Sequence, residues 1–128
     1  MFITSPYLLK FRKKTKANLI ITLSINNTML TLIDNTGNVL IKVSAGIVGL
    51  KGPKKPTFHA AEVMTKFLAK QAHNKGIKYI DVIIYGPIHG KIKLILRTLK
   101  KTKLKVKYFF NFLKIAHNGM RKKKLRRM

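Results

Sequence analysis

Alternating apolar and polar positions in the first third of the chain predict a series of short strands. The segment from Asn18 to Ile25 is rich in β-branched and aliphatic residues. Its apolar residues share one face at a period of two: Leu19, Ile21, Leu23 and Ile25. Thr28–Ile33 and Val39–Ser44 are predicted as the second and third strands. Because the connections are short, the three strands are expected to form an antiparallel meander.

Two short polar segments predict the turns of this meander. Asn26 and Asn27 tolerate a positive φ, which a tight hairpin requires. Asp34–Asn38 predicts the second turn, with Gly37 as the left-handed residue.

The next part of the chain predicts a loop, a helix and a strand. Ala45–Pro56 is rich in glycine, proline and lysine and has no periodicity, so it is predicted as a loop. Thr57 is a good N-cap for a helix that ends at Gly76. The expected buried face of this helix comprises Ala61, Met64, Leu68 and Ala72. Ile77–Tyr85 is almost continuously apolar, which suits a central strand covered on both faces.

The last third predicts a second helix-strand unit. After the glycine-containing turn Gly86–Gly90, apolar residues recur at helical spacing: Ile92, Ile95, Leu96 and Leu99. The final strand is expected to turn one set of residues into the core: Leu104, Val106, Tyr108 and Phe110. Its other face would carry Lys103, Lys105 and Lys107, a pattern that is also typical of a solvated edge strand.

The order of these elements predicts an α/β fold with a mixed sheet, made of three antiparallel strands followed by two helix-strand units. Right-handed crossovers then give parallel pairing, with the helices covering the sheet. A length of 128 residues suits one core. We expect a single domain over residues 17–116, between a basic N-terminal arm, 1–16, and a basic C-terminal tail, 117–128.

The charge of the chain changes this picture of an ordinary small domain. There are 28 Lys+Arg residues against 3 Asp+Glu, which gives a formal net charge of +25. Because self-repulsion of this size opposes the compact state, a polyanionic partner is expected. Nucleic acid is the leading candidate, since neutralised phosphates release counterions. An anionic membrane is weaker, because no apolar run approaches the roughly 20 residues of a span and no helix joins a strongly basic face to an aromatic one.

Cations are concentrated at the two ends of the chain. The N-terminal arm contains Lys13, Lys14 and Lys16. After the Asn118-Gly119 turn signal, the tail has six cations and no acid: Arg121, Lys122, Lys123, Lys124, Arg126 and Arg127. It contains too little apolar surface to order without a polyanion, so we predict that it contacts nucleic acid. A solvated charged end is the alternative for the tail taken alone.

The residues that could carry chemistry do not form a catalytic motif. The three carboxylates, Asp34, Glu62 and Asp81, lie far apart in sequence, and the four histidines lack metal-ligand spacing. The absence of cysteine excludes disulfides and cysteine-based zinc sites. We therefore expect no enzyme activity, no metal and no cofactor. The glycines of Gly86–Gly90 could still present N–H groups to a phosphate at a helix N-terminus.

An ordered series of short motifs from about Ala17 to Met128 resembles one known family. The motifs are Asn26-Asn27-Thr28, Asp34, Gly37-Asn38, Ser44-Ala45-Gly46, Gly49-Leu50-Lys51-Gly52, Lys55, Thr57, Ala60-Ala61, Gly86-Pro87, Gly90, Arg97-Thr98-Leu99, His117-Asn118-Gly119, Arg121 and Arg126-Arg127. In this order and at these spacings they resemble the universal small-subunit ribosomal protein S-eleven family.

The resemblance implies a ribonuclease-H-like topology without a catalytic role, on the platform of the small ribosomal subunit. The implied partners are small-subunit ribosomal RNA, neighbouring small-subunit ribosomal proteins and messenger RNA near its exit. The motif positions, joined by the cations of both ends and of the second helix, give the candidate RNA-binding residues: Lys13, Lys14, Lys16, Asn26, Asn27, Thr28, Lys51, Gly52, Lys54, Lys55, Gly86, Pro87, Gly90, Lys91, His117, Asn118, Gly119, Arg121, Lys122, Lys123, Lys124, Arg126 and Arg127.

Residue usage and departures from the family pattern predict the compartment. Lysine far outnumbers arginine, as AT-rich coding produces. The family's Cys-Arg-Pro-Pro-Lys is replaced by Met120-Arg121-Lys122-Lys123-Lys124. We expect an organelle-encoded ribosome, mitochondrial before plastid, with an AT-rich bacterial cytoplasm as the alternative. The functional alternatives are a non-specific nucleic-acid-binding protein and a degenerate nuclease.

Overall fold

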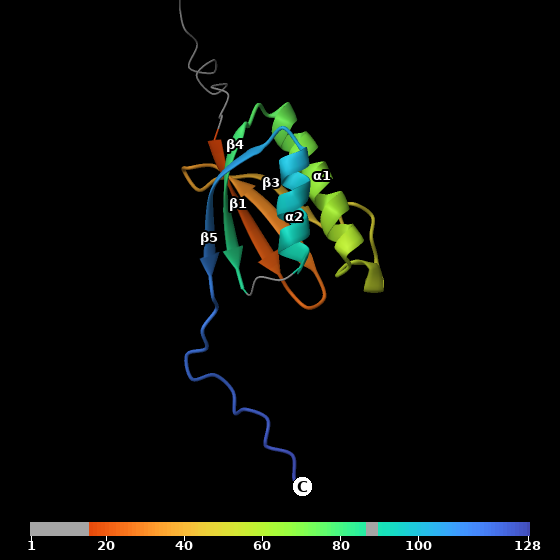
Figure 1. The fold of residues 1–128 in the computed structure, drawn as a ribbon, viewed down its shortest axis with the longest axis vertical. Helices are drawn as coiled ribbons and strands as arrows, with labels where there is room; N and C mark the ends of the chain where they lie inside the picture. Colours follow the sequence, from red (N-terminus) through yellow and green to blue (C-terminus); the bar gives the residue numbers. More distant parts are fainter. Residues whose placement is uncertain (1–15, 87–89) are drawn as a thin grey trace, which may run out of the picture.

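The computed structural model describes residues 16–86 and 90–128 as one five-stranded sheet with two helices (Figure 1). The strands are β1 Lys16–Leu23, β2 Thr28–Ile33, β3 Val39–Ser44, β4 Tyr79–Tyr85 and β5 Lys105–Phe112. The helices are α1 Phe58–Asn74 and α2 Gly90–Lys101, with a short 3-10 turn, η2, at Gly52–Lys54. The predicted α/β class and mixed sheet are confirmed, and the predicted bounds of the second and third strands match those of β2 and β3.

The strand order β3-β2-β1-β4-β5 places β1 at the centre of the sheet. β1 pairs antiparallel with β2 and parallel with β4, and β4 pairs parallel with β5. The strands β1, β4 and β5 therefore all end at the same edge of the sheet. Because each helix runs back between two parallel strands, α1 and α2 both begin at this edge. We call it the loop end.

One face of the sheet packs against both helices and forms the core. Alternate residues of the central strands are fully buried on this face, among them Leu19 and Ile21 of β1 and Val82 of β4. The predicted stripe of α1 is confirmed, since Ala61, Met64, Leu68 and Ala72 are all buried. In α2, Ile92, Ile95 and Leu99 are buried and Leu96 packs against them partly exposed. Burial of each large aliphatic side chain stabilises the fold by about 1.5–3 kcal/mol.

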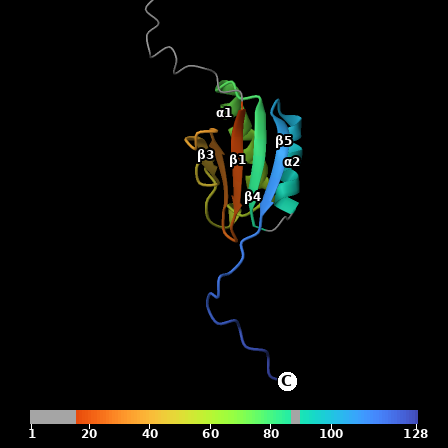
Figure 2. The ribbon, with the colours of Figure 1, turned by 90° about the vertical axis from the view of Figure 1, so that its left-hand side faces the viewer.

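The opposite face of the sheet carries no helix in the part of the chain that the structure describes (Figure 2). The prediction that Ile77–Tyr85 is covered on both faces is therefore wrong. The segment is almost continuously apolar because both sides of β4 are largely apolar, with Asp81 as the exception on the uncovered side, although only one side packs against the helices. We call the uncovered side of β1, β4 and β5 the open face; it carries Lys16, Asn18, Ile20, Thr22, Tyr79, Asp81, Ile83, Tyr85, Lys105, Lys107, Tyr108, Phe110 and Phe112.

The alternation predicted for the last strand fails at a β-bulge. The register passes from Ile80 opposite Val106 to Val82 opposite Phe109, so two residues of β5 face Asp81 alone. An extra residue shifts a period-two pattern by one position and reverses the faces beyond it. Tyr108 and Phe110 are consequently 59% and 46% exposed on the open face instead of entering the core.

The first hairpin also differs from its prediction. β1 ends at Leu23, and Ile25 is 91% exposed in the turn. The Ser24 N–H donates to the Asn27 carbonyl (2.9 Å), and the Asn27 N–H donates to Ser24 Oγ (3.1 Å). Among the described non-glycine residues only Asn118 has a positive φ, so the hairpin closes through the Ser24 side chain and not through left-handed asparagines. The left-handed conformation predicted for Gly37 is confirmed, at φ 92°.

We predict that Thr28→Val stabilises the fold. The Thr28 side chain is fully buried, and its Oγ1 has no hydrogen-bond partner among the described residues. An unsatisfied buried hydroxyl costs about 1–3 kcal/mol, so a valine of similar shape should raise the free energy of unfolding by about 1 kcal/mol. Urea unfolding followed by circular dichroism measures this change. Thr31→Val on the half-buried opposite side of β2 is the control and should have a smaller effect; a Thr28→Val variant less stable than the wild type would contradict the prediction.

We predict that Thr57→Ala destabilises the start of α1. Thr57 Oγ1 accepts the Ala60 N–H (3.2 Å), which confirms the predicted cap, and donates to the Lys54 carbonyl (2.7 Å). Loss of such a cap lowers the free energy of unfolding by about 1 kcal/mol. Thr57→Ser keeps the hydroxyl and should remain close to the wild type in the same urea titration. Equal midpoints for the alanine and serine variants would show that the cap contributes nothing.

Candidate nucleic-acid interface

Most of the predicted RNA-contacting segments converge at the loop end. β1 leads into the Ser24–Asn27 hairpin, and β4 leads into Gly86, at the same edge of the sheet. The loop between β3 and α1 reaches this edge because α1 begins there. The chain also leaves the domain here after β5 and continues into the tail (Figure 1). Segments that are widely separated in sequence thus share one end of the molecule.

The hairpin and the lysine-glycine loop enclose a shallow hollow of about 480 Å³. It is lined by Asn26, Asn27, Gly52, Pro53, Lys55 and Pro56. Asn27 Oδ1 accepts the Thr28 N–H (2.9 Å), which fixes the orientation of the amide. Lys51 and Lys54 are exposed beside the hollow, and Lys55 is half-buried in it. Amide donors next to lysines suit the oxygens of phosphate and ribose.

The lysine-glycine loop is held in place by its own hydrogen bonds. The Lys54 N–H donates to Lys51 and the Lys55 N–H to Gly52, which forms the η2 turn. Gly52 has a φ of 57°, a conformation that residues with a side chain rarely adopt. Because Thr57 also bonds the Lys54 carbonyl, the lysines of the loop are tied to the start of α1.

Both helix N-termini add positive potential at the loop end. Neither helix has an acidic residue in its first turn, so the positive end of each helix dipole favours an anion there. Lys91 lies in the first turn of α2. A Cβ on Gly90 would come within 3.1 Å of the Phe58 ring at the start of α1, so glycine allows the two helix starts to pack closely.

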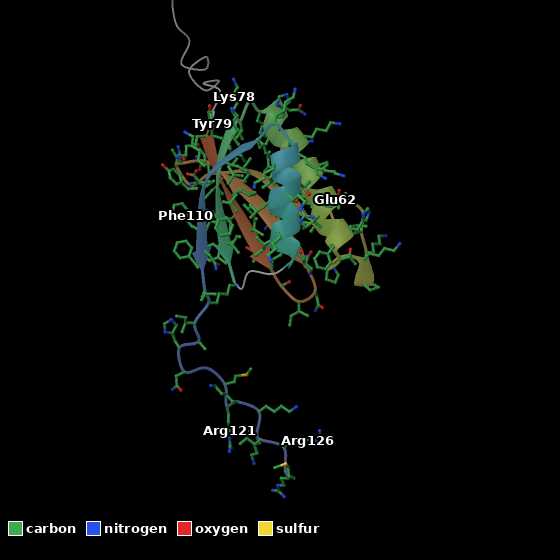
Figure 3. The ribbon with its side chains drawn as sticks, viewed as in Figure 1. Glu62, Lys78, Tyr79, Phe110, Arg121 and Arg126 are labelled. Atoms are coloured by element: carbon green, nitrogen blue, oxygen red, sulfur yellow. The ribbon has the colours of Figure 1, made fainter. Side chains whose placement is uncertain are left out.

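The tail leaves this end of the domain as an exposed segment. Figure 3 shows Arg121 and Arg126 on the extended chain beyond β5. His117–Met128 is exposed at every residue, and Asn118 adopts the left-handed conformation with a φ of 55°. The Gly86 N–H donates to the Phe112 carbonyl (3.0 Å). This hydrogen bond fixes the end of β5, from which the chain continues into the tail.

The loop-end segments themselves contain no acidic residue, and of the three acids only Glu62 lies near them. Asp81 pairs with Lys16 (3.0 Å), and Asp34 lies in the β2–β3 turn at the other end of the sheet. Glu62, on α1, pairs with Lys66 at 2.8 Å. The hydrogen bond from Lys66, together with its positive charge, lowers the pKa of Glu62 below its ordinary value. The carboxylate nearest the loop end, that of Glu62, is therefore already paired with a lysine.

Some predicted residues are not part of this cluster. Lys16 begins β1 at the opposite end, where its ammonium group pairs with Asp81. The Thr28 side chain is buried, so of the hairpin motif only the asparagines are accessible. Lys13, Lys14 and Pro87 lie outside the described residues. The sequence interpretation also missed the exposed rings of the open face, because it assigned Tyr108 and Phe110 to the core.

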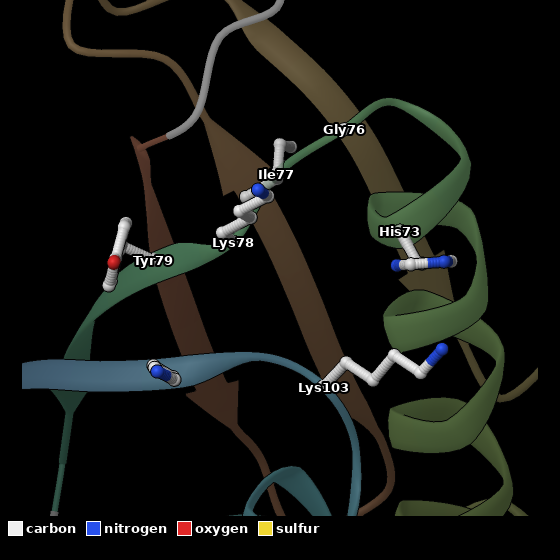
Figure 4. A pocket seen from close by; sticks show the side chains of 7 residues that line it. His73, Gly76, Ile77, Lys78, Tyr79 and Lys103 are labelled. Carbon is white, nitrogen blue, oxygen red and sulfur yellow. The ribbon is translucent and has the colours of Figure 1, made fainter.

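A second hollow, of about 320 Å³, lies at the opposite end of the sheet (Figure 4). It is lined by His73, Gly76, Ile77, Lys78, Tyr79, Lys103 and Lys105, and contains no carboxylate.

Within residues 16–86 and 90–128 no three His, Cys, Asp or Glu side chains are grouped as a metal site would require. No helix in the same residues is long and apolar enough to cross a membrane. The loop end therefore offers cations and amide donors, and both kinds of group bind anions.

Comparison with known proteins assigns the chain to a family. Residues 17–127 match the family model for ribosomal protein S11. Small ribosomal subunit protein uS11 of Chlorobaculum parvum is 39% identical over 105 residues, 82% of each chain. The uS11m protein of Prototheca wickerhamii is 40% identical over 119 residues, 93% of this chain and 92% of its own. Small ribosomal subunit protein uS11 of Thermotoga maritima is 40% identical over 103 residues, 80% and 78% of the two chains. The chain belongs to the ribosomal protein S11 family, whose members are structural, non-enzymatic components of the small ribosomal subunit.

Proposed function

We propose that this protein binds small-subunit ribosomal RNA through its loop end and its C-terminal tail. The observation that carries the proposal is the convergence at one edge of the hairpin, the lysine-glycine loop, two helix N-termini and the end of β5, from which the tail continues. The hairpin, the loop, the first helical turns and the tail contain no acidic residue. An edge of this kind offers cations and N–H donors to several phosphates at once.

The chemistry of the loop end favours recognition of RNA shape. Lysines and backbone amides bind phosphate and ribose oxygens, which every nucleotide carries, so they position the protein without reading bases. The tail has too few apolar residues to fold alone and would order along the phosphates. In this proposal residues 17–116 form the globular domain, while 1–16 and 117–128 act as basic extensions.

The place in the ribosome follows from the family resemblance. We propose the platform of the small subunit, near the messenger RNA exit, with neighbouring small-subunit proteins and messenger RNA as further partners. The uS11m relative from Prototheca wickerhamii and the lysine-rich composition support a mitochondrial ribosome. Sedimentation of the chain with small-subunit particles from purified mitochondria tests this compartment, and its recovery only with plastid or bacterial particles would contradict it.

Crosslinking of native particles tests the RNA partner. Crosslinks confined to one domain of the small-subunit ribosomal RNA are expected. The composition alone, at a net charge of +25, favours one other candidate, a non-specific nucleic-acid-binding protein. In that case crosslinks would scatter over RNA and DNA, and duplex DNA would compete as well as ribosomal RNA at the same salt concentration.

We predict that deletion of Lys122–Met128 reduces the salt dependence of RNA binding. The deletion removes five cations: Lys122, Lys123, Lys124, Arg126 and Arg127. Each lost phosphate contact lowers the slope of log K against log salt by about 0.7–0.9, so the slope should fall by roughly 3 to 5. Filter binding of the small-subunit ribosomal RNA domain over a range of salt concentrations measures it.

A matched variant separates the tail from net charge. Lysine-to-glutamine substitutions at five exposed positions near the helix ends opposite the loop end remove the same charge: Lys70, Lys75, Lys100, Lys101 and Lys103. This variant should keep a slope close to that of the wild type. Equal slopes for the truncated and full-length chains would show that the tail does not contact RNA.

A further inference from the structure

We propose that the open face of the sheet binds unpaired RNA nucleotides by stacking their bases on the aromatic side chains of β4 and β5. The inference rests on the proposed function and names a second RNA-binding surface with a different chemistry. Figure 3 shows Tyr79 and Phe110 on the side of the sheet away from the helices.

Five aromatic side chains lie on this part of the open face, on two adjacent strands: Tyr79, Tyr85, Tyr108, Phe110 and Phe112. The Tyr85 and Phe112 rings are stacked, with centroids 5.8 Å apart and planes inclined by 25°. The Tyr108 and Phe110 centroids are 6.3 Å apart. All of these rings except Tyr79 are exposed. A group of exposed rings on one surface is uncommon in a monomer and marks a binding site.

The β-bulge creates this arrangement. Without it, the alternation along β5 would place Tyr108 and Phe110 on the face that packs against α2. With it, Lys107 and Tyr108 both lie opposite Asp81, and Phe110 lies beside Ile83 on the open face. Bulges re-aim side chains in this way near functional sites.

Cations accompany the rings. Lys107 Nζ lies 4.5 Å from the centre of the Tyr79 ring, and Lys16 Nζ lies 5.8 Å from that of Tyr108. Lys16 also pairs with Asp81, the only acid on the described strands of the sheet, at 3.0 Å. The open face therefore combines aromatic surfaces with positive charge, and its carboxylate is neutralised. Single-stranded nucleic acid requires this combination, since bases stack on the rings and phosphates pair with the cations.

Two observations favour RNA over a protein partner on this face. Lysine is depleted in the cores of protein interfaces, whereas here Lys16 and Lys107 lie among the rings. The open face is also continuous with the loop end, because the Tyr85–Phe112 pair lies where β4 and β5 end. An RNA strand bound at the loop end can thus continue onto the rings.

The test compares the full chain with a Tyr108→Leu/Phe110→Leu variant. The probes are an eight-residue oligouridine and an abasic ribose-phosphate oligomer of the same length and charge. Stacking contributes about 1–3 kcal/mol for each base, so the wild type should bind oligouridine at least about fivefold more tightly than the abasic oligomer. The variant should lose at least about fivefold on oligouridine and be unchanged on the abasic oligomer, because no cation is removed.

Two further variants serve as controls. Tyr108→Phe/Phe110→Tyr keeps both rings and should bind oligouridine as the wild type does. Phe67→Leu removes a partly exposed ring from α1, on the helix side, and should have no effect on oligouridine binding. Circular dichroism confirms that each variant folds; because the replaced rings are exposed, the fold should be retained.

The outcomes separate this inference from the proposed function. If the leucine variant binds oligouridine as the wild type does while ribosomal RNA binding still depends on the tail, the inference is overturned and the proposed function stands. If oligouridine binding is kept but the variant no longer enters small-subunit particles, a protein occupies the open face and the inference is also overturned. If the wild type does not bind ribosomal RNA at all, the proposed function itself fails.

Discussion

The parallel pairing of β1 with β4 is the constraint on which the rest of the structure depends. It places the ends of β1, β4 and β5 at one edge, so the hairpin after β1 and the glycine after β4 become neighbours. The two helical crossovers, from β3 to β4 through α1 and from β4 to β5 through α2, also advance in a single direction across the sheet. Right-handed crossovers that advance in one direction lie on the same face. Both helices therefore cover one side, and the open face is a direct consequence of the topology.

The same topology separates the charges. Both helices begin at the loop end, where the lysine-glycine loop and the tail are found, whereas Asp34 lies at the far end and Asp81 within the sheet. A net charge of +25 repels itself, and the packed aliphatic core must offset that repulsion in the free chain. Phosphates at the loop end would reduce the repulsion where cations are densest, so binding and folding stabilise each other.

Local signals predicted much of this fold, and long-range pairing determined the rest. The apolar stripes of α1 and α2, the Thr57 cap and the bounds of β2 and β3 follow from spacing over a few residues. The bulge in β5 depends on how that strand meets β4, which no local pattern encodes. The motifs identified the loop-end residues individually. They did not indicate that Lys16 would pair with Asp81 or that the Thr28 side chain would be buried. The predicted set of elements, five strands and two helices, was the one feature of the sequence that indicated an uncovered face.

β5 connects the two surfaces proposed to bind RNA, because its rings lie on the open face and its last residue lies at the loop end. It is an edge strand with exposed rings, which in a free protein is a template for aggregation. Lys105 and Lys107 and the high net charge keep free chains apart. If RNA phosphates neutralise that charge in an assembled particle, as proposed, this protection would weaken when the protein binds. A partner that covers the rings at the same time would prevent aggregation through β5. An RNA strand that runs from the loop end onto the open face would both supply the phosphates and cover the rings.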